Sequence, residues 1–268
     1  EFDASPENID KRTLRTDLKG GLKLSLLSKK TRGEQVNAML YLRLGDENSL
    51  KGQSITAGLA GQMLMRGTAR HTRQQIRDEF DRLKAQVSVS GSTTAAMASI
   101  QTMRDNLKPV LDLVAEILKE PSFPQSEFEQ LKQEQLAGLE NQKSEPQVIA
   151  MIALQRHLSP YPKGDVRYAP TLEERIEETK ALPLDQVKGF HKSFYGASDG
   201  EITLIGDFDA DAVQKQLGDL FSGWKSPRKY VRVEGKYQKI APKAEAFETP
   251  DTANAMWMAG TPIRMTDT

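Results

Sequence analysis

The stretch GLAGQMLMRGT, residues 58–68, decides how this sequence folds. Ser54 can cap a helix that runs on to about Arg66, and Gly67 can end it. Gly58 and Gly61 each cost such a helix about 1 kcal/mol relative to alanine. We therefore expect a neighbouring element to come close to the helix at these two glycines.

Turn residues and periodic apolar residues predict alternating strands and helices along the rest of the chain. Gly20-Gly21 separates two short runs that form a hairpin, and the residues from Val36 to Leu44 alternate as in a half-buried strand. A second hairpin is expected around Gly91-Ser92-Thr93, and a strand at 201–205. Further helices are expected at 72–83 with Thr72 as cap, 107–119 with Asn106 as cap, 126–143 with a continuation to 158, 172–181, 184–195, and toward 221 from Asp209.

The composition excludes several classes of function. Lys plus Arg and Asp plus Glu number 37 each among the 268 residues, so no net charge draws the chain to nucleic acid or to an anionic membrane. Its apolar runs are shorter than the roughly 20 residues of a membrane-spanning helix, so no span is expected. Without cysteine, the chain has no disulfide, thiolate metal site or cysteine nucleophile.

The C-terminal part differs in character from the rest. Residues 225–243 contain seven Lys or Arg and a single Glu, with a proline near each end, which is typical of a solvated linker or an edge segment. A nucleic-acid-binding tail is the less economical alternative. Ala253 to Gly260 resembles a strand. We therefore expect a domain over 1–224, a basic connection over 225–243, and the first strand region of a further domain over 244–268.

Several short motifs, in order, resemble the pitrilysin/insulinase family of zinc peptidases, the inverzincins. The resemblance extends from about Leu14 to Trp224. It rests on Gly45, Gly52, Leu59 to Thr68, Thr72, Tyr161-Pro162-Lys163-Gly164, Arg167-Tyr168, Pro170-Thr171, Gly206-Asp207-Phe208, Phe221 and Trp224. It implies an α+β fold like that of pitrilysin and mitochondrial processing peptidase, in two layers, with helices packed on one face of a mixed, largely antiparallel sheet.

The residues of the zinc site are missing from the motif. In the catalytic half of the family the helix carries His-x-x-Glu-His, where two imidazoles one turn apart hold zinc and the glutamate acts as general base. Aligned on Gly67-Thr68, the two histidine positions fall on Gly58 and Gln62, and the glutamate position falls on Gly61. Glycine has no ligand atom and an amide is a poor one, so no catalytic residue is expected here.

The family's third zinc ligand is also missing. It is a glutamate about seventy-five residues further on, which places it near Gly138 in this sequence. Glu134 and Glu140 lie close by, but both are expected on a solvated face of their helix. The chain itself is therefore expected to bind no metal or other cofactor.

The resemblance thus points to the non-catalytic half of such a peptidase. It implies that this chain encloses peptide substrates and supports a catalytic half that holds the zinc, in the same polypeptide or in a separate subunit. Arg167 and Tyr168 are the candidate substrate contacts, although an arginine stacked within its own loop is the simpler interpretation. The resemblance also suggests a bacterial periplasmic or envelope location, with any export signal upstream.

Two other functions stay open. One is a scaffold or assembly protein without peptidase activity. The other is a metallopeptidase with an unorthodox site, although His71, His157 and His191 show no metal-ligand spacing.

Overall fold

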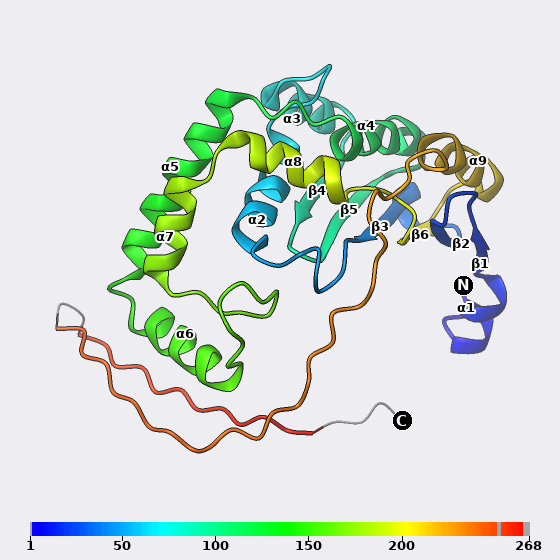
Figure 1. Cartoon of the computed structure of the whole chain (residues 1–268). Helices are drawn as coiled ribbons and strands as arrows, with labels where there is room; N and C mark the ends of the chain where they lie inside the picture. Colours follow the sequence, from blue (N-terminus) through cyan, green and yellow to red (C-terminus); the bar gives the residue numbers. More distant parts are fainter. Residues whose placement is uncertain (1, 251–252, 265–268) are drawn as a thin grey trace.

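The computed structural model describes residues 2–250 and 253–264 (Figure 1). Within these residues the chain forms a six-stranded sheet in the order β1-β2-β6-β3-β5-β4. The strands are β1 (Leu14–Asp17), β2 (Lys23–Ser28), β3 (Gln35–Arg43), β4 (Gln86–Gly91), β5 (Ala95–Met103) and β6 (Gly200–Gly206). Only the β2–β6 pair is parallel in this sheet, and the other four pairs are antiparallel. The sheet is therefore mixed and largely antiparallel, as expected.

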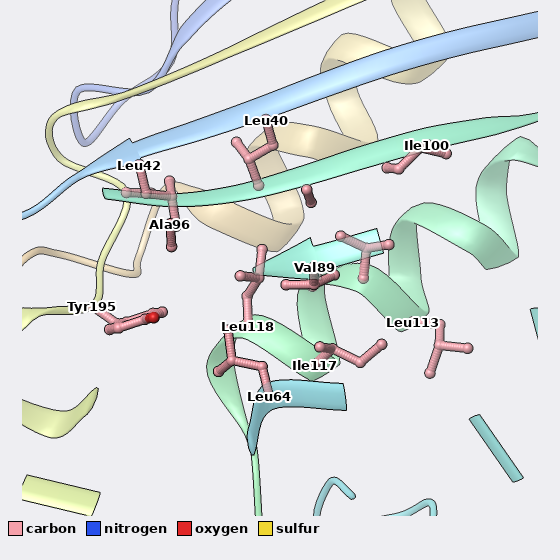
Figure 2. Close-up of a cluster of buried hydrophobic side chains, with 14 of the residues drawn as sticks. Leu40, Leu42, Leu64, Val89, Ala96, Ile100, Leu113, Ile117, Leu118 and Tyr195 are labelled. Atoms are coloured by element: carbon pink, nitrogen blue, oxygen red, sulfur yellow. The ribbon is translucent and has the colours of Figure 1, made fainter. Parts of the chain in front are cut away.

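Helices cover one face of this sheet. The α-helices are α1 (Pro6–Arg12), α2 (Ser54–Met63), α3 (Arg73–Arg82), α4 (Leu107–Lys119), α5 (Gln125–Gln142), α6 (Pro146–Leu158), α7 (Leu172–Ala181), α8 (Leu184–Phe194) and α9 (Ala210–Phe221). Alternate residues of β3, such as Leu40, are buried under the helices, whereas Met39 is exposed on the other face. Figure 2 shows Leu113 and Ile117 of α4 beneath Val89 and Ile100 of the sheet. The predicted two-layer α+β class is confirmed.

Local sequence signals fix most of the element boundaries. Both predicted hairpins form, and Thr72 caps α3 in a capping box with Gln75. Two predicted caps are wrong. Ser54 is the first residue of α2 rather than its cap, and the Asn106 side chain donates to the carbonyl of Leu83 instead of capping α4. The amide of Asn106 has a tertiary partner that the local sequence does not reveal.

Two longer-range expectations also need correction. The predicted continuation of the 126–143 helix to Leu158 is wrong, because α5 ends at Gln142 and Pro146 begins a separate helix, α6. In addition, the described residues of 244–268 form no strand, including the expected one at 253–260, since no other described strand pairs with them. Residues 251–252 and 265–268 lie outside the described part.

Residues 225–250 and 253–264, which we call the strap, run as an extended chain past α6 (Figure 1). Val231 N–H donates to the carbonyl of Gly45, and the imidazole Nε2 of His157 lies 2.9 Å from the carbonyl oxygen of Ala241. No helix within residues 2–250 and 253–264 is long and apolar enough to cross a membrane.

Candidate functional site

The motif helix lies between the sheet and α5. Helix α2 ends at Met63, and a 3-10 turn over Leu64–Arg66 leads to Gly67, whose φ of 143° favours glycine. One side of α2 packs on β4 and α8. The other side faces α5, where the Gln62 side-chain carbonyl accepts a hydrogen bond of 2.7 Å from the Gln135 amide. The motif positions therefore face two different environments.

Gly61, at the position of the general base, is closed in by the end of β4. A Cβ atom added to Gly61 would lie 2.4 Å from the backbone nitrogen of Gly91 and 2.6 Å from its carbonyl oxygen. Gly91 is in turn covered by the hydroxyl of Tyr195, which would lie 2.3 Å from a Cβ atom added to Gly91. A glutamate side chain has no room at Gly61 in this arrangement. Gly91 and Tyr195 are far from Gly61 in the sequence, so no local signal predicts these contacts.

Tyr195 is buried, with 2% of its surface exposed, and its ring reaches into the core (Figure 2). Its hydroxyl has no hydrogen-bond partner among the described residues. Burial raises the pKa of this phenol far above its usual range, so the hydroxyl stays protonated. The ring of His191 lies 4.6 Å from the Tyr195 ring, between centroids.

The three metal-ligand positions face the open side. Apart from the neighbouring residues and backbone of its own helix, nothing described lies within 4 Å of a Cβ atom added at Gly58 or at Gly138. The expected close approach is therefore correct at Gly61 and wrong at Gly58, because only Gly61 faces the sheet. Gln62 is exposed and is paired with Gln135, one turn before the predicted third-ligand position. The sequence analysis missed Gln135.

Arg66, at the end of the motif, joins α5 to the motif helix. It donates to Glu134 at 2.7 Å and to Glu127 at 3.2 Å, and it is almost completely buried. The hydrogen bond from Arg66 lowers the pKa of Glu134. Glu134 is exposed, as predicted, and it is also the ion-pair partner of Arg66. Glu140 is half-exposed and pairs with Lys143 on its own helix.

The Gly-Thr end of the motif is held by a buried carboxylate. Glu116 of α4 accepts hydrogen bonds from the hydroxyl of Thr68 and from Nε of Arg70, and its Oε1 lies 2.8 Å from Nδ1 of His71. Burial alone would raise the pKa of Glu116, but these three partners outweigh it and lower the pKa below its usual value. This cluster fixes the turn between α2 and α3.

Arg167 and Tyr168, the candidate substrate contacts, are engaged within the chain. The Arg167 guanidinium binds Asp165 and Glu47, donates to the Glu234 carbonyl of the strap, and lies 4.3 Å from the centre of the Tyr161 ring. The hydrogen bond to Asp165 raises the pKa of the Arg167 guanidinium above its already high ordinary value. The Tyr168 hydroxyl donates a hydrogen bond to Glu174 and accepts one from the guanidinium of Arg156. Both side chains fasten the 159–170 loop, and a role in substrate binding stays a prediction.

The three histidines lie apart and serve separate contacts. His71 binds Glu116, whereas His157 and His191 each bond a backbone carbonyl. Burial lowers the pKa of His191. Across the described ranges, no group of three or more His, Asp or Glu side chains is arranged to hold a metal ion.

Comparison with known protein families agrees with this geometry. Residues 25–162 match the model of the insulinase family, peptidase family M16. The chain belongs to the insulinase (M16) family. Residues 181–267 match a second model, the peptidase M16 inactive domain, which agrees with the predicted resemblance to the inactive half.

Individual relatives are distant and longer. A non-peptidase homolog, YmxG of Helicobacter pylori, is 24% identical over 228 residues, which cover 85% of this chain and 51% of that protein. The crystal structure of a peptidase M16 inactive domain from Pseudomonas fluorescens is similar with a TM-score of 0.68 and 23% identity, over 85% of this chain and 54% of that one. The crystal structure of a protease from Helicobacter pylori is similar with a TM-score of 0.67 and 17% sequence identity, also over 85% of this chain and 54% of that one. This M16 chain thus spans about half the length of these relatives, and the structural likeness shows the fold alone.

Proposed function

We propose that this chain is a non-catalytic M16 domain that supports a separate catalytic half and helps to enclose its peptide substrates. The observation that carries the proposal is the motif helix. Its ligand positions hold no ligand side chains, and its base position is closed by Gly91 and Tyr195. The family match to an inactive domain supports it. The zinc and the general base would then belong to the catalytic half.

The test is reconstitution. The protein is purified with the M16 protein or segment of its genome that carries His-x-x-Glu-His, and cleavage of a fluorogenic peptide library is measured with and without this chain. We expect a stable assembly in which this chain raises peptide cleavage, and no cleavage by this chain alone. Failure to assemble with any such partner would refute the proposal.

A scaffold without peptidase activity is the second candidate. It is supported by the non-peptidase name of the Helicobacter pylori relative. In that case the purified assembly would lack a His-x-x-Glu-His protein and would cleave no peptide.

A metallopeptidase with an unorthodox site is the third candidate. Metal analysis of the dialysed chain distinguishes it, since stoichiometric zinc together with peptide cleavage by the chain alone would favour it. For location, we propose the bacterial periplasm or envelope. Fractionation of cells that express the full gene tests this.

A further inference from the structure

A hollow lies at the start of α2, about one turn before Gly58. It has a volume of about 320 Å³ and is formed by the first turn of α2, the loop over residues 163–170 and the junction of α7 with α8. The loop is fixed in this place, because the backbone N–H of Gly52 donates to the carbonyl of Gly164 at 2.9 Å. A hollow of this size suits a small molecule.

The first turn of α2 carries hydrogen-bond donors that the protein leaves unused. The helix is ten residues long, and the residue before it, Gln53, makes no capping hydrogen bond with its side chain. The backbone N–H groups of Ser54, Ile55 and Thr56 have no partner within the described part of the chain. Free N–H groups together with the positive end of the helix dipole attract a negatively charged group.

A buried hydroxyl in the same turn also points to a ligand. Only 6% of Thr56 is exposed, and this residue lines the hollow. Its hydroxyl has no hydrogen-bond partner among the described residues, and it is not sealed in the core as the unpartnered hydroxyl of Tyr195 is. A hydroxyl that is buried this far normally has a partner. The hollow is the place from which a ligand can supply one.

The wall of the hollow that belongs to α7 is acidic. Glu178 lies on this wall and pairs with Lys163 at 3.6 Å, but the same ammonium lies closer, at 3.2 Å, to Glu174. The other acid of the lining, Asp165, is already paired with Arg167. Helix α7 also ends at this wall, so the negative end of its dipole lies there. This wall therefore suits a positively charged group.

We propose that the hollow binds a small zwitterion with an apolar side chain, either a free α-amino acid or a dipeptide. The carboxylate lies at the free N–H groups of α2 and the hydroxyls of Ser54 and Thr56, and the ammonium lies at Glu178. Ile55 and Leu182, which also line the hollow, contact the apolar side chain. The inference does not rest on the proposed function, because no catalytic half takes part in this site.

The experiment is isothermal titration calorimetry of the purified protein with leucine and with the dipeptide Leu-Leu. Binding of one or both is expected, and the tighter ligand distinguishes the free amino acid from the dipeptide. The N-acetyl derivative of that ligand lacks the ammonium, and its amide lacks the carboxylate. Each derivative should bind at least about tenfold more weakly than the zwitterion, because each loses a hydrogen bond to a charged group.

Matched variants test the residues of the site. Thr56→Val removes the hydroxyl and should weaken binding of the zwitterion about tenfold, whereas Thr56→Ser keeps the hydroxyl and should not. Glu178→Gln should weaken it by a similar factor but leave binding of the N-acetyl derivative unchanged, since that derivative has no ammonium. Glu177→Gln is the control, because Glu177 is exposed on the same helix and does not line the hollow. Circular dichroism verifies that the variants are folded.

The assignment would be overturned if neither leucine nor Leu-Leu bound at millimolar concentration. It would also be overturned if the N-acetyl derivative bound as tightly as the zwitterion, or if Glu177→Gln weakened binding as much as Glu178→Gln. None of these results bears on assembly with a catalytic half, which the reconstitution experiment tests separately.

Discussion

Replacing the two motif glycines by alanine should change stability in opposite directions. Each substitution removes the helix penalty of glycine, which is about 1 kcal/mol. At Gly58 nothing described outside its own helix lies within 4 Å of the new methyl group, so Gly58→Ala should stabilise the protein by up to about 1 kcal/mol.

At Gly61 the same methyl group would meet the backbone of Gly91. The contact would be 2.4 Å, where ordinary contacts begin at 3.4 Å, so β4 would have to retreat by about 1 Å. Overpacking of this kind costs about 1–3 kcal/mol, and the upper end applies because three backbone atoms rather than a flexible side chain are involved. Set against the helix gain, Gly61→Ala should destabilise by about 1–2 kcal/mol.

The assay is equilibrium urea unfolding followed by circular dichroism, with both variants and the wild type at one pH. We expect Gly58→Ala to be more stable than Gly61→Ala by about 2–3 kcal/mol, with equal dependence on urea concentration. If Gly61→Ala proved as stable as Gly58→Ala, the close packing of α2 on β4 would be refuted as the reason for this glycine.

Three further predictions follow from the site. Tyr195→Phe removes a buried hydroxyl without a described partner and should stabilise the protein by about 1 kcal/mol in the same urea assay, whereas a loss of stability would reveal a partner for that hydroxyl. The pKa of Glu116 in the folded protein is below its ordinary value of 4.5, so its contribution to stability is complete above pH 4.5 and is lost as the pH falls through the folded pKa. Glu116→Gln should therefore cost about 1–3 kcal/mol at pH 7 and flatten the decline of melting temperature below pH 4.5. A decline of melting temperature below pH 4.5 as steep as in the wild type would contradict this. Gly58→His combined with Gln62→His should create a zinc-binding pair on the open side of α2, measurable by calorimetry, with Gly58→His alone as the control; equal zinc binding by the single variant would show that the pair does not form.

The elements that the sequence predicted correctly are those specified by neighbouring residues. Thr72 and Gln75 form their capping box within four residues, and the Gly20-Gly21 hairpin needs only its own turn. Ser54 was displaced by a single position, which is the usual uncertainty of a helix end. The prediction of a continuous helix to Leu158 was wrong although Pro146 is a local signal against it, because proline begins helices more readily than it continues them.

The parts that the sequence did not predict depend on distant contacts. Nothing near Gly61 indicates that Gly91 and Tyr195 cover it, because these residues come from β4 and from the end of α8. Asn106 looked like a cap because the local sequence does not reveal the carbonyl of Leu83. The missing zinc ligands could be predicted, since a ligand is a property of one side chain. The contacts that now surround these positions, such as Gln135 at Gln62, could not be predicted because they come from distant parts of the chain.

The motif positions therefore differ in how they depart from a zinc peptidase. Gly58, Gln62 and Gly138 face open space or an amide partner, so ligand side chains could return there without moving the backbone. Gly61 differs, because a glutamate there would have to displace β4, where the backbone N–H of Val89 also donates a hydrogen bond to the sulfur of Met65. Metal binding and catalysis are thus separable in this fold. A variant of this chain can be expected to regain zinc well before it regains a general base, and the packing of one strand against one glycine is what divides the two.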